Sequence, residues 1–323
     1  MNHFLPALAL LVSAGLIKLI LSSRVRGSLQ DMPNARSLHA APVPRSGGVA
    51  LMAGIFAAWL LSLDVMVWWV ILPTLLLFAV SFIDDLRGLS VGKRLLAHMS
   101  AAALLVLGAG VWQHHGLAVA LLVWLLSVWM TNLYNFMDGS DGLAGGMAVI
   151  GFSTLGLASM WGQDEALAWL NFAIAGAAAG FLWFNFNPAK IFMGDAASIP
   201  LGFLVAAMGV WGWQGLLWPA WFPVLAFAPF VVDATVTLIK RSLRGRKITE
   251  AHRDHYYQRL VRLGAGHRNT ALLGYALMLG AASSALWLLS HPAGLLPLLM
   301  MWAVAYAALM LWLDRRWKVS GLE

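Results

Sequence analysis

Two adjacent carboxylates, Asp84 and Asp85, follow a long apolar run and are the first residues of this chain that could do chemistry. Neighbouring carboxylates in a weakly polar setting repel each other. One of them is therefore expected to act as a proton acceptor, while the other faces a cation or Arg87. A helix cap or a loop pair would account for the same residues without chemistry, so both interpretations stay open here.

A second group of polar residues follows another apolar run in the pattern Asn132-x-x-Asn135-x-x-Asp138-x-x-Asp141. Asn132 and Asn135 are three residues apart, so both project from about the same side of a helix. Amides followed by two carboxylates suit a nucleotide base and a divalent cation bound by oxygen ligands. A plain Asp-Gly turn is the alternative, but such a turn needs no asparagine pair before it. The pattern therefore favours a binding site.

A third segment alternates aromatic rings with amides, at Phe184, Asn185, Phe186 and Asn187, and reaches Asp195 a few residues later. Such a run can stack on a base and hydrogen-bond it, and Asp195 is a further candidate ligand for Mg²⁺. Asparagines before a proline could instead cap backbone groups. We favour the binding interpretation here too.

Arg45 precedes two glycines, Gly47 and Gly48, where an apolar run begins. Backbone N–H groups at the start of a helix can bind phosphate, and an adjacent guanidinium would strengthen that binding. A helix-entry loop with an ordinary basic residue explains the pattern equally simply.

His252, His255 and Arg259 are spaced at i, i+3 and i+7, which would place them on one face of a helix. Imidazoles and a guanidinium on one face suit a polyanion such as a pyrophosphate. Zinc is disfavoured because no third ligand follows at the usual spacing. A basic stretch that binds anionic lipid is the alternative, and it describes residues 241–247 better.

The elements that position these residues are membrane helices. The chain is 61% hydrophobic and only 11% charged, with a mean hydropathy of +0.77, whereas soluble domains are about 25% charged. We therefore exclude a soluble protein and predict an all-α, polytopic membrane protein. With about 20 residues per span, eleven spans are predicted, near 4–22, 47–63, 65–83, 95–112, 117–134, 143–161, 166–184, 197–213, 216–239, 270–290 and 294–313. We treat residues 1–323 as a single membrane domain.

The charges predict the orientation. All 21 lysines and arginines fall in loops or helix ends on one side of this span map. Basic loops face the cytoplasm, so the N-terminus is predicted outside and the C-terminus inside. The five aspartates at positions 84, 85, 138, 141 and 195 fall on the same face. The net charge of +7 is then a topology signal, and nucleic acid is excluded as a partner.

Asp233 lies inside the ninth predicted span, about 10 Å from its end at 1.5 Å per residue. It either pairs with a basic group in the bundle or helps to hold the site, and the sequence does not decide between the two.

Taken together, these segments resemble the polyprenyl-phosphate N-acetylhexosamine-1-phosphate transferases of glycosyltransferase family 4. Two stretches are similar to that family's signatures: Asn132-x-x-Asn135-x-x-Asp138-Gly139-x-Asp141-Gly142-Leu143 and Asn185-x-x-Pro188-Ala189-Lys190-x-Phe192-Met193-Gly194-Asp195. The last loop, His252-Arg253-x-His255-x-Tyr257-Gln258-Arg259, looks like the branch that makes O-antigen and other surface polysaccharides.

The resemblance implies transfer of an amino-sugar 1-phosphate from a UDP-sugar to undecaprenyl phosphate, with release of UMP. It implies a bacterial plasma-membrane enzyme whose active site faces the cytoplasm and whose cofactor is Mg²⁺, with Mn²⁺ as a substitute. A homodimer is left open. The residues implied in catalysis are Asp84, Asp85, His252, His255 and Arg259. Those implied in substrate binding are Arg45, Gly48, Asn132, Asn135, Asp138, Asp141, Asn185 and Lys190, and the metal ligands are Asp195 and Asp138.

One position departs from the family pattern. After Gly194-Asp195 the family usually has x-Gly-Ser, whereas this chain has Ala196, Ala197 and Ser198. If the glycine allows close approach to the metal or diphosphate, Ala197 narrows the site.

Two other functions are weighed against transfer to a polyprenyl phosphate. A CDP-alcohol phosphotransferase would have Asp-Gly-x-x-Ala-Arg followed by spaced aspartates on the next helix. Here Asp138-Gly139 is followed by Ser140-Asp141-Gly142, with no arginine and no later aspartate in that span. A transporter without chemistry would need its acids at mid-membrane, whereas here they gather at one face.

Overall fold

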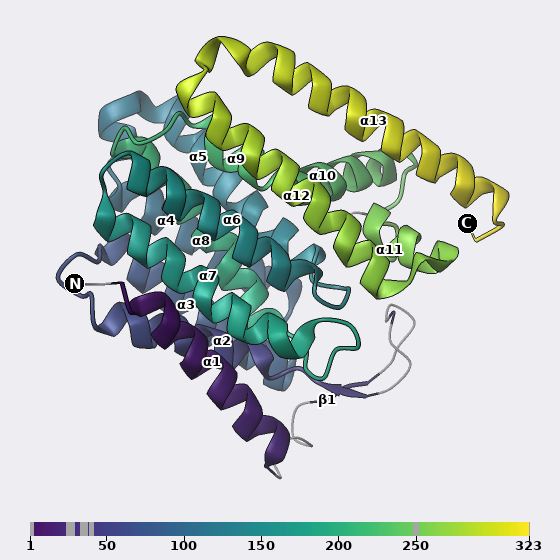
Figure 1. Cartoon of the computed structure of the whole chain (residues 1–323), viewed down its shortest axis with the longest axis horizontal. Helices are drawn as coiled ribbons and strands as arrows, with labels where there is room; N and C mark the ends of the chain where they lie inside the picture. Colours follow the sequence, from purple (N-terminus) through teal and green to yellow (C-terminus); the bar gives the residue numbers. More distant parts are fainter. Residues whose placement is uncertain (1–2, 24–29, 33–37, 39–41, 248–251, 323) are drawn as a thin grey trace.

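The computed structural model describes residues 3–23, 30–32, 38, 42–247 and 252–322. Helices running alongside one another make up most of it, and the two chain ends lie at opposite ends of the bundle (Figure 1). The long helices are α1 (Leu5–Ser22), α2 (Gly47–Leu60), α3 (Trp68–Arg87), α4 (Val91–Gly108), α5 (Val111–Phe136), α6 (Leu143–Trp161), α7 (Glu165–Asn185), α8 (Asp195–Gln214), α10 (Ala228–Leu243), α12 (Gly266–Ser290) and α13 (Leu295–Val319).

Shorter elements connect the long helices. α9 (Trp221–Ala226) precedes α10, and α11 (Tyr256–Leu260) continues into a π-helical turn (Val261–Ala265) before α12. A 3₁₀ turn (Pro292–Gly294) joins α12 to α13. Two short strands, β1 (Gln30–Asp31) and β2 (Val43–Pro44), pair antiparallel between α1 and α2, with Gln30 opposite Pro44.

The prediction of an all-α polytopic membrane protein is confirmed. Among the described residues, nine helical segments are long and apolar enough to cross a membrane. Two of the eleven predicted spans differ from the rest. α2 has only 14 residues, and the ninth predicted span is broken between α9 and α10 at Phe227. The count of eleven and the orientation stay predictions, and Arg24, Arg26 and Arg36 of the first basic loop lie outside the described residues.

The helix ends differ from the predicted ends by several residues. α3 extends to Arg87, so Asp84 and Asp85 lie in its last turn and not in a loop, and Gly88, with φ +67°, ends the helix. α5 reaches Phe136 and includes both Asn132 and Asn135. Hydropathy reports the thickness of the apolar layer, whereas a helix ends where backbone hydrogen bonding stops, so helices continue past the apolar window.

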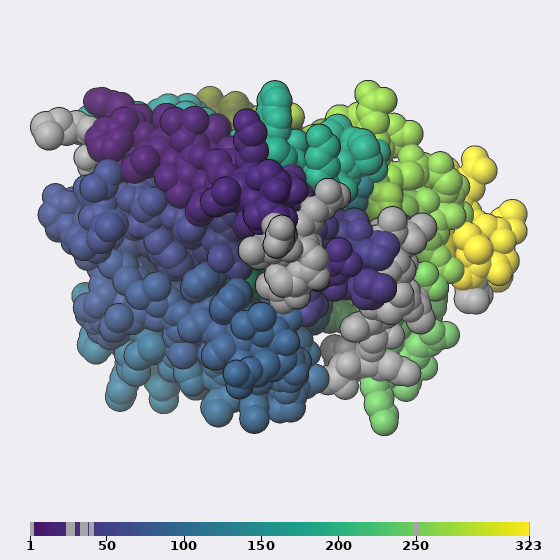
Figure 2. All heavy atoms as spheres, turned by 90° about the horizontal axis from the view of Figure 1, so that it is seen from below, coloured from purple at the N-terminus to yellow at the C-terminus, as the bar shows by residue number. Residues whose placement is uncertain are grey.

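The most buried helices are α6, α7 and α8, whose apolar windows are 72%, 67% and 83% buried, against 11% for α13. α1 packs on α2 and α7 on one side of this centre, and α12 packs on α6 on another. Figure 2 shows one face of the molecule, with α1 (purple) and the next helices (blue) at one end and the C-terminal helices (green and yellow) at the other. The central helices, and the loops that leave them, therefore lie between α1 and α2 on one side and α12 on another.

Candidate active site

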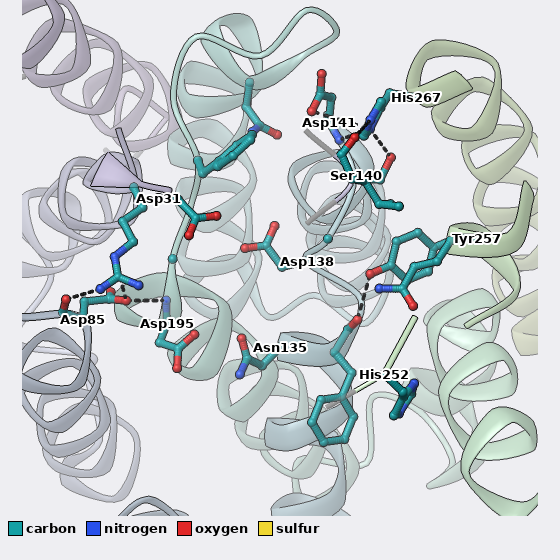
Figure 3. Close-up of a pocket in the computed structure, with 18 residues that line it drawn as sticks. Asp31, Asp85, Asn135, Asp138, Ser140, Asp141, Asp195, His252, Tyr257 and His267 are labelled. Atoms are coloured by element: carbon teal, nitrogen blue, oxygen red, sulfur yellow. Dashed lines mark hydrogen bonds and ion pairs between the residues drawn. The ribbon is translucent and has the colours of Figure 1, made fainter. Parts of the chain in front are cut away.

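A polar cavity of about 320 Å³ lies where the loops after α5 and α7 meet the ends of α3, α8, α11 and α12 (Figure 3). Of the fourteen predicted site residues, eight line it: Arg45, Asp85, Asn135, Asp138, Asp141, Asn185, Asp195 and His252. The other lining residues are Asp31, Leu38, Phe136, Gly139, Ser140, Phe192, Gly194, Tyr257, Gln258 and His267. The structure thus brings together carboxylates from three segments that are far apart in sequence.

Asp85 joins α3 to the start of α8. Its carboxylate accepts hydrogen bonds from the backbone N–H of Asp195, at 3.3 Å, and of Ala196, at 2.9 Å. These N–H groups belong to the first turn of α8, where they have no partner within the helix. Arg45 donates to the backbone oxygen of Asp85, and its Nε lies 3.9 Å from the carboxylate. Gly194, with φ +70°, makes the turn that presents both N–H groups.

Asp84 does not line the cavity. Its carboxylate accepts a hydrogen bond from the backbone N–H of Leu89 and another from Arg94 of α4, at 3.2 Å. The same Arg94 guanidinium lies 3.4 Å from Asp195. Arg94 therefore links the two carboxylates, and Asp84 is placed to orient this group and not to contact a substrate in the cavity.

Asp138 lies at the centre of the cavity, between Asp85 and Asp195 on one side and Asp141 on the other (Figure 3). Burial, and then the negative charges of Asp195, Asp85 and Asp31, raise the pKa of Asp138 to about 7. Carboxylates held this close together repel one another when they are ionised. Each therefore favours a bound proton, and together they favour a bound cation.

Asp138 and Asp195 fit a divalent cation by their chemistry, since Mg²⁺ is commonly held by one or two carboxylates with substrate phosphates completing its shell. Within the described part of the chain, no three His, Cys, Asp or Glu side chains already form a metal site. The two carboxylates therefore supply part of a ligand set.

The asparagines have different neighbours. Asn135 lines the cavity and accepts a hydrogen bond from the Ser198 hydroxyl, at 2.8 Å. Asn132 does not line it, because its amide donates to the backbone oxygen of Val128 one turn earlier. The expectation that both asparagines reach a ligand is therefore corrected for Asn132.

Asn185 and Asp141 connect the two signature loops. Asn185 accepts a hydrogen bond from the N–H of Gly142 and donates to the backbone oxygen of Ile191, both at 2.9 Å. Asp141 accepts from the Asn187 amide, at 2.8 Å, and from the N–H of Ala189, at 3.1 Å. Both side chains line the cavity, and they also hold its wall in shape.

The phosphate-binding expectation for Gly48 is wrong. Its N–H donates to the backbone oxygen of Met193, at 2.9 Å, and that of Gly47 donates to Phe192, at 3.0 Å. A side chain at Gly48 would begin 2.3 Å from the Met193 oxygen and 2.8 Å from the Cβ of Ala197. Gly48 is thus needed for close packing of α2 on α8. The methyl group of Ala197 fills that contact and does not line the cavity, so the expected narrowing by Ala197 is not seen either.

His252 and His255 do not share a helical face with Arg259, because the helix begins only at Tyr256. Asp233 of α10 accepts hydrogen bonds from the N–H of Tyr256 and Tyr257, both at 2.9 Å, and lies 3.4 Å from His255. The sequence left the role of Asp233 open, and the structure shows that it holds this segment. His252 lines the cavity, whereas His255 is buried behind it.

A comparison with known proteins bears on what this cavity does. The family described as glycosyl transferase family 4 matches residues 67–212, from α3 to α8. A probable undecaprenyl-phosphate N-acetylglucosaminyl 1-phosphate transferase of Bacillus subtilis is 28% identical over 267 residues, covering 76% of this chain and 73% of that protein. From α3 to α8 the chain therefore resembles glycosyl transferase family 4, and its relatives over most of its length carry the names of transferases of this kind.

Other relatives of this chain carry similar names. A decaprenyl-phosphate N-acetylglucosaminephosphotransferase of Mycobacterium tuberculosis (strain ATCC 25618 / H37Rv) is 29% identical over 301 residues, covering 78% of this chain and 74% of the relative. A phospho-N-acetylmuramoyl-pentapeptide-transferase of Listeria welshimeri is 34% identical over 143 residues, covering 43% and 42%. These relatives are all named as transferases of a phosphate-bearing group, and this protein is an enzyme of that kind.

Arg259 lies outside the cavity. Its guanidinium pairs with Asp314 of α13, at 2.8 Å, and stacks over the rings of Tyr256 and Trp317. Lys240 of α10 pairs with the same Asp314. The predicted contact of Arg259 with pyrophosphate is therefore not made in this geometry. Lys190 is exposed and does not line the cavity either.

We expect Asp314→Ala to destabilise the protein by about 2 kcal/mol, because it leaves the buried Arg259 and the half-buried Lys240 without their carboxylate. The KM for the nucleotide sugar should change less than twofold, since none of the three lines the cavity. Thermal unfolding in detergent and steady-state kinetics measure the two effects. A large rise in KM with an unchanged melting temperature would show that Arg259 contributes to binding of the nucleotide sugar.

We expect the protein to lose stability on acidification through His252. Burial, and then the neighbouring His255 and Arg241, lower the pKa of His252 to about 4. An unfolded histidine titrates near 6.5, so between pH 6.5 and 4 the unfolded chain binds a proton that the folded chain does not. Stability therefore falls as the pH falls through this window.

His252→Gln should reduce that acid-dependent loss by on the order of 2 kcal/mol. Unfolding of the wild type and the variant at pH 7 and pH 4.5 measures the difference. Equal pH slopes in the two proteins would show that His252 is not held neutral.

Four polar groups of the cavity wall were not given roles from sequence. Tyr257 donates to the backbone oxygen of Phe136, at 3.0 Å, Gln258 reaches the cavity beside it, and His267 contacts Ser140. Asp31 of β1 also lines the cavity. One feature of the sequence could have marked His267 as a site residue: it lies just before the tenth predicted span, on the membrane face that carries the acidic residues.

Proposed function

We propose that this enzyme transfers an N-acetylamino-sugar 1-phosphate from a UDP-sugar to undecaprenyl phosphate, releasing UMP, and so starts a lipid-linked surface polysaccharide such as O-antigen. The observation that carries the proposal is the meeting of Asp85, Asp138 and Asp195 in one polar cavity of a membrane helix bundle. The names of the relatives support a sugar-phosphate donor and a polyprenyl-phosphate acceptor. We place the cavity at the cytoplasmic face of the bacterial plasma membrane.

Asp138 and Asp195 would hold a divalent cation, Mg²⁺ or in its place Mn²⁺. Such a cation supplies charge neutralisation for the diphosphate of the donor and for the leaving UMP. Asp138 lies at the centre of the cavity and Asp195 on one side of it (Figure 3), so the diphosphate of the bound donor would lie between these carboxylates and the neutral groups of the opposite wall.

The chemistry consists of one displacement at phosphorus. An oxygen of the lipid phosphate attacks the β-phosphorus of the UDP-sugar, and the bond from that phosphorus to the bridging oxygen breaks. UMP leaves with the bridging oxygen and the electron pair of the broken bond. Asp85 lies at the cavity edge next to Arg45, where a carboxylate can orient the lipid phosphate or accept its remaining proton.

Direct attack by the lipid phosphate is proposed over a phospho-enzyme. Both oxygens of Asp85 accept hydrogen bonds from the first turn of α8, and hydrogen bonding to the charged form lowers the nucleophilicity of a carboxylate. The binding of Asp85 to that turn therefore favours a positioning role over attack on phosphorus.

The enzyme should catalyse no exchange of labelled UMP into the UDP-sugar when undecaprenyl phosphate is absent. Exchange without the lipid requires a covalent sugar-phosphate on the protein. Purified protein in detergent, with Mg²⁺, the UDP-sugar and labelled UMP, tests this. Exchange at a rate near that of turnover would establish the phospho-enzyme route.

The proposed function itself is tested with purified protein, undecaprenyl phosphate, Mg²⁺ and a panel of UDP-sugars that includes UDP-GlcNAc, UDP-FucNAc and UDP-QuiNAc. UMP release and the lipid product are followed together. Turnover with one UDP-sugar identifies the donor. Absence of UMP release with every donor, from protein that is folded and bound to lipid phosphate, would overturn the proposal.

Neither alternative gains support from the cavity. A CDP-alcohol phosphotransferase would require an arginine near Asp138, whereas the residues that line the cavity there are Ser140 and His267. A carrier would need its carboxylates along a path through the bundle. The buried windows of α6 and α8 contain a single acidic residue, Asp195, and it lies at the end of its helix.

A further inference from the structure

His267 lines the cavity, and the proposed displacement assigns it no role. It is the second residue of α12. Figure 3 shows it beside Ser140 and Asp141, across the cavity from Asp85 and Asp195. Its side chain is 18% exposed, so it is packed in place and also accessible from the cavity.

The hydrogen bonds of His267 determine which of its ring nitrogens carries the proton. The backbone N–H of Asp141 points to Nδ1, at 3.3 Å, and the Ser140 hydroxyl lies 3.0 Å from the same atom. A backbone N–H can only donate, so this contact favours Nδ1 as the unprotonated acceptor of the neutral ring. In the neutral ring the proton is then on Nε2.

The proton on Nε2 has a poor partner within the protein. Nε2 lies 3.4 Å from the backbone oxygen of Leu38, another cavity-lining residue. N–H···O hydrogen bonds are normally 2.7–3.2 Å long. A ligand oxygen in the cavity can therefore replace this contact at little cost.

The charge pattern of the cavity indicates which part of a ligand meets His267. The carboxylates of Asp85, Asp138 and Asp195 gather on one side and in the centre. Near His267 the groups are neutral hydrogen-bonding ones, apart from Asp141. One oxygen of Asp141 is bound by Asn187 and Ala189, and the other lies 3.6 Å from Nδ1 of His267. An uncharged part of a ligand fits this side better than its diphosphate.

We propose that His267 is a substrate-binding residue whose Nε2–H donates a hydrogen bond to an uncharged acceptor oxygen of the nucleotide sugar. The inference rests on the proposed function, because it names a residue that recognises the nucleotide sugar of that reaction. Two groups of the donor carry such an oxygen, the pyrimidine base and the N-acetyl group of the sugar. The experiment separates these two sources.

Two variants separate the acceptor function of Nδ1 from the donor function of Nε2. His267→Asn places an acceptor where Nδ1 lies and keeps the bond to the Asp141 N–H, but it has nothing at the position of Nε2. His267→Gln reaches the position of Nε2 with an amide donor and has no acceptor at that of Nδ1. Arg268→Gln is the matched control, since Arg268 is the next residue of α12 and is exposed.

The variants are purified in detergent, and their KM and kcat with UDP-GlcNAc and their affinity for UDP alone are measured beside thermal unfolding. We expect His267→Asn to raise the KM about tenfold, as for loss of one hydrogen bond, with kcat within about twofold and an unchanged melting temperature. His267→Gln should stay within about threefold of the wild type, and Arg268→Gln should not differ from it. Weaker binding of UDP by His267→Asn places the acceptor on the base, and loss confined to UDP-GlcNAc places it on the sugar.

The reverse order, with His267→Asn near wild type and His267→Gln impaired, would overturn the inference, because His267 would then only position the turn at Asp141. Two wild-type-like variants would overturn it as well. If the wild type itself neither binds nor turns over any UDP-sugar, the proposed function fails, whereas a negative result confined to the variants removes only the role of His267.

Discussion

Asp195→Asn is expected to reduce sugar-phosphate transfer by about a thousandfold or more while leaving the protein at least as stable as the wild type. The loss of rate follows from the loss of a carboxylate that would hold the cation, an interaction worth several kcal/mol in the transition state. Stability should not fall, because the Asp195 carboxylate is desolvated by burial and repelled by Asp85 and Asp84, and these effects outweigh its attraction to Arg94. Removing one of these like charges relieves that repulsion.

The measurement pairs UMP release, over a range of Mg²⁺ concentrations, with thermal unfolding in the same detergent. Asp64→Asn is the control, since Asp64 is exposed in the turn between α2 and α3 and does not line the cavity. Turnover near that of the wild type would remove Asp195 from the proposed cation site. Loss of activity together with a lower melting temperature would show that Asp195 serves the fold.

Asp85→Asn is expected to reduce turnover by about a hundredfold or more and, in contrast to Asp195→Asn, to destabilise the protein. Asp85 accepts both N–H groups at the start of α8, and an asparagine offers one acceptor oxygen in place of two. Loss of a helix cap costs about 1 kcal/mol, and the partly buried Arg45 also loses its charged neighbour. The rate falls because the group that orients the lipid phosphate has lost its charge.

Turnover at saturating UDP-sugar, the KM for undecaprenyl phosphate and the unfolding temperature distinguish the two effects of Asp85→Asn. We expect the KM for the lipid to rise more than that for the UDP-sugar. Asp254→Asn serves as a control for charge removal, because Asp254 pairs with Arg241 outside the cavity. An Asp85→Asn protein that is destabilised but fully active would make Asp85 a helix cap without a role at the lipid phosphate.

The opposite stability effects expected for Asp85 and Asp195 could not be predicted from sequence. Both are aspartates at the ends of apolar helices, and burial cost alone marks both as functional candidates. Asp85 is satisfied by backbone donors of another helix, more than a hundred residues later in the chain. Asp195 has one cationic neighbour, Arg94, and is otherwise desolvated and repelled by Asp85 and Asp84. The difference comes from packing between α3 and α8, which local composition does not encode.

The sequence by itself determined the class of molecule and the set of acids. Apolar runs long enough to cross a bilayer and few charges exclude a soluble fold, because desolvating charged groups is costly and hydrophobic burial is not directional. The same cost explains why Asp85, Asp138, Asp141 and Asp195, carboxylates at the ends of such runs, were found without a structure. The spacing of the polar residues was enough to suggest the family.

Only the tertiary structure decided which of these residues face one cavity. Helix spacing predicts a shared face for His252, His255 and Arg259. The chain there becomes helical only at Tyr256, however, and Arg259 pairs with Asp314 outside the cavity. The N–H of Gly48 is not available to a phosphate because it donates to the carbonyl oxygen of Met193. His267 joined the site through contacts with residues more than a hundred positions earlier. Hydrogen-bond partners and side-chain directions of this kind arise where distant segments pack, so they follow from the three-dimensional fold and not from local sequence.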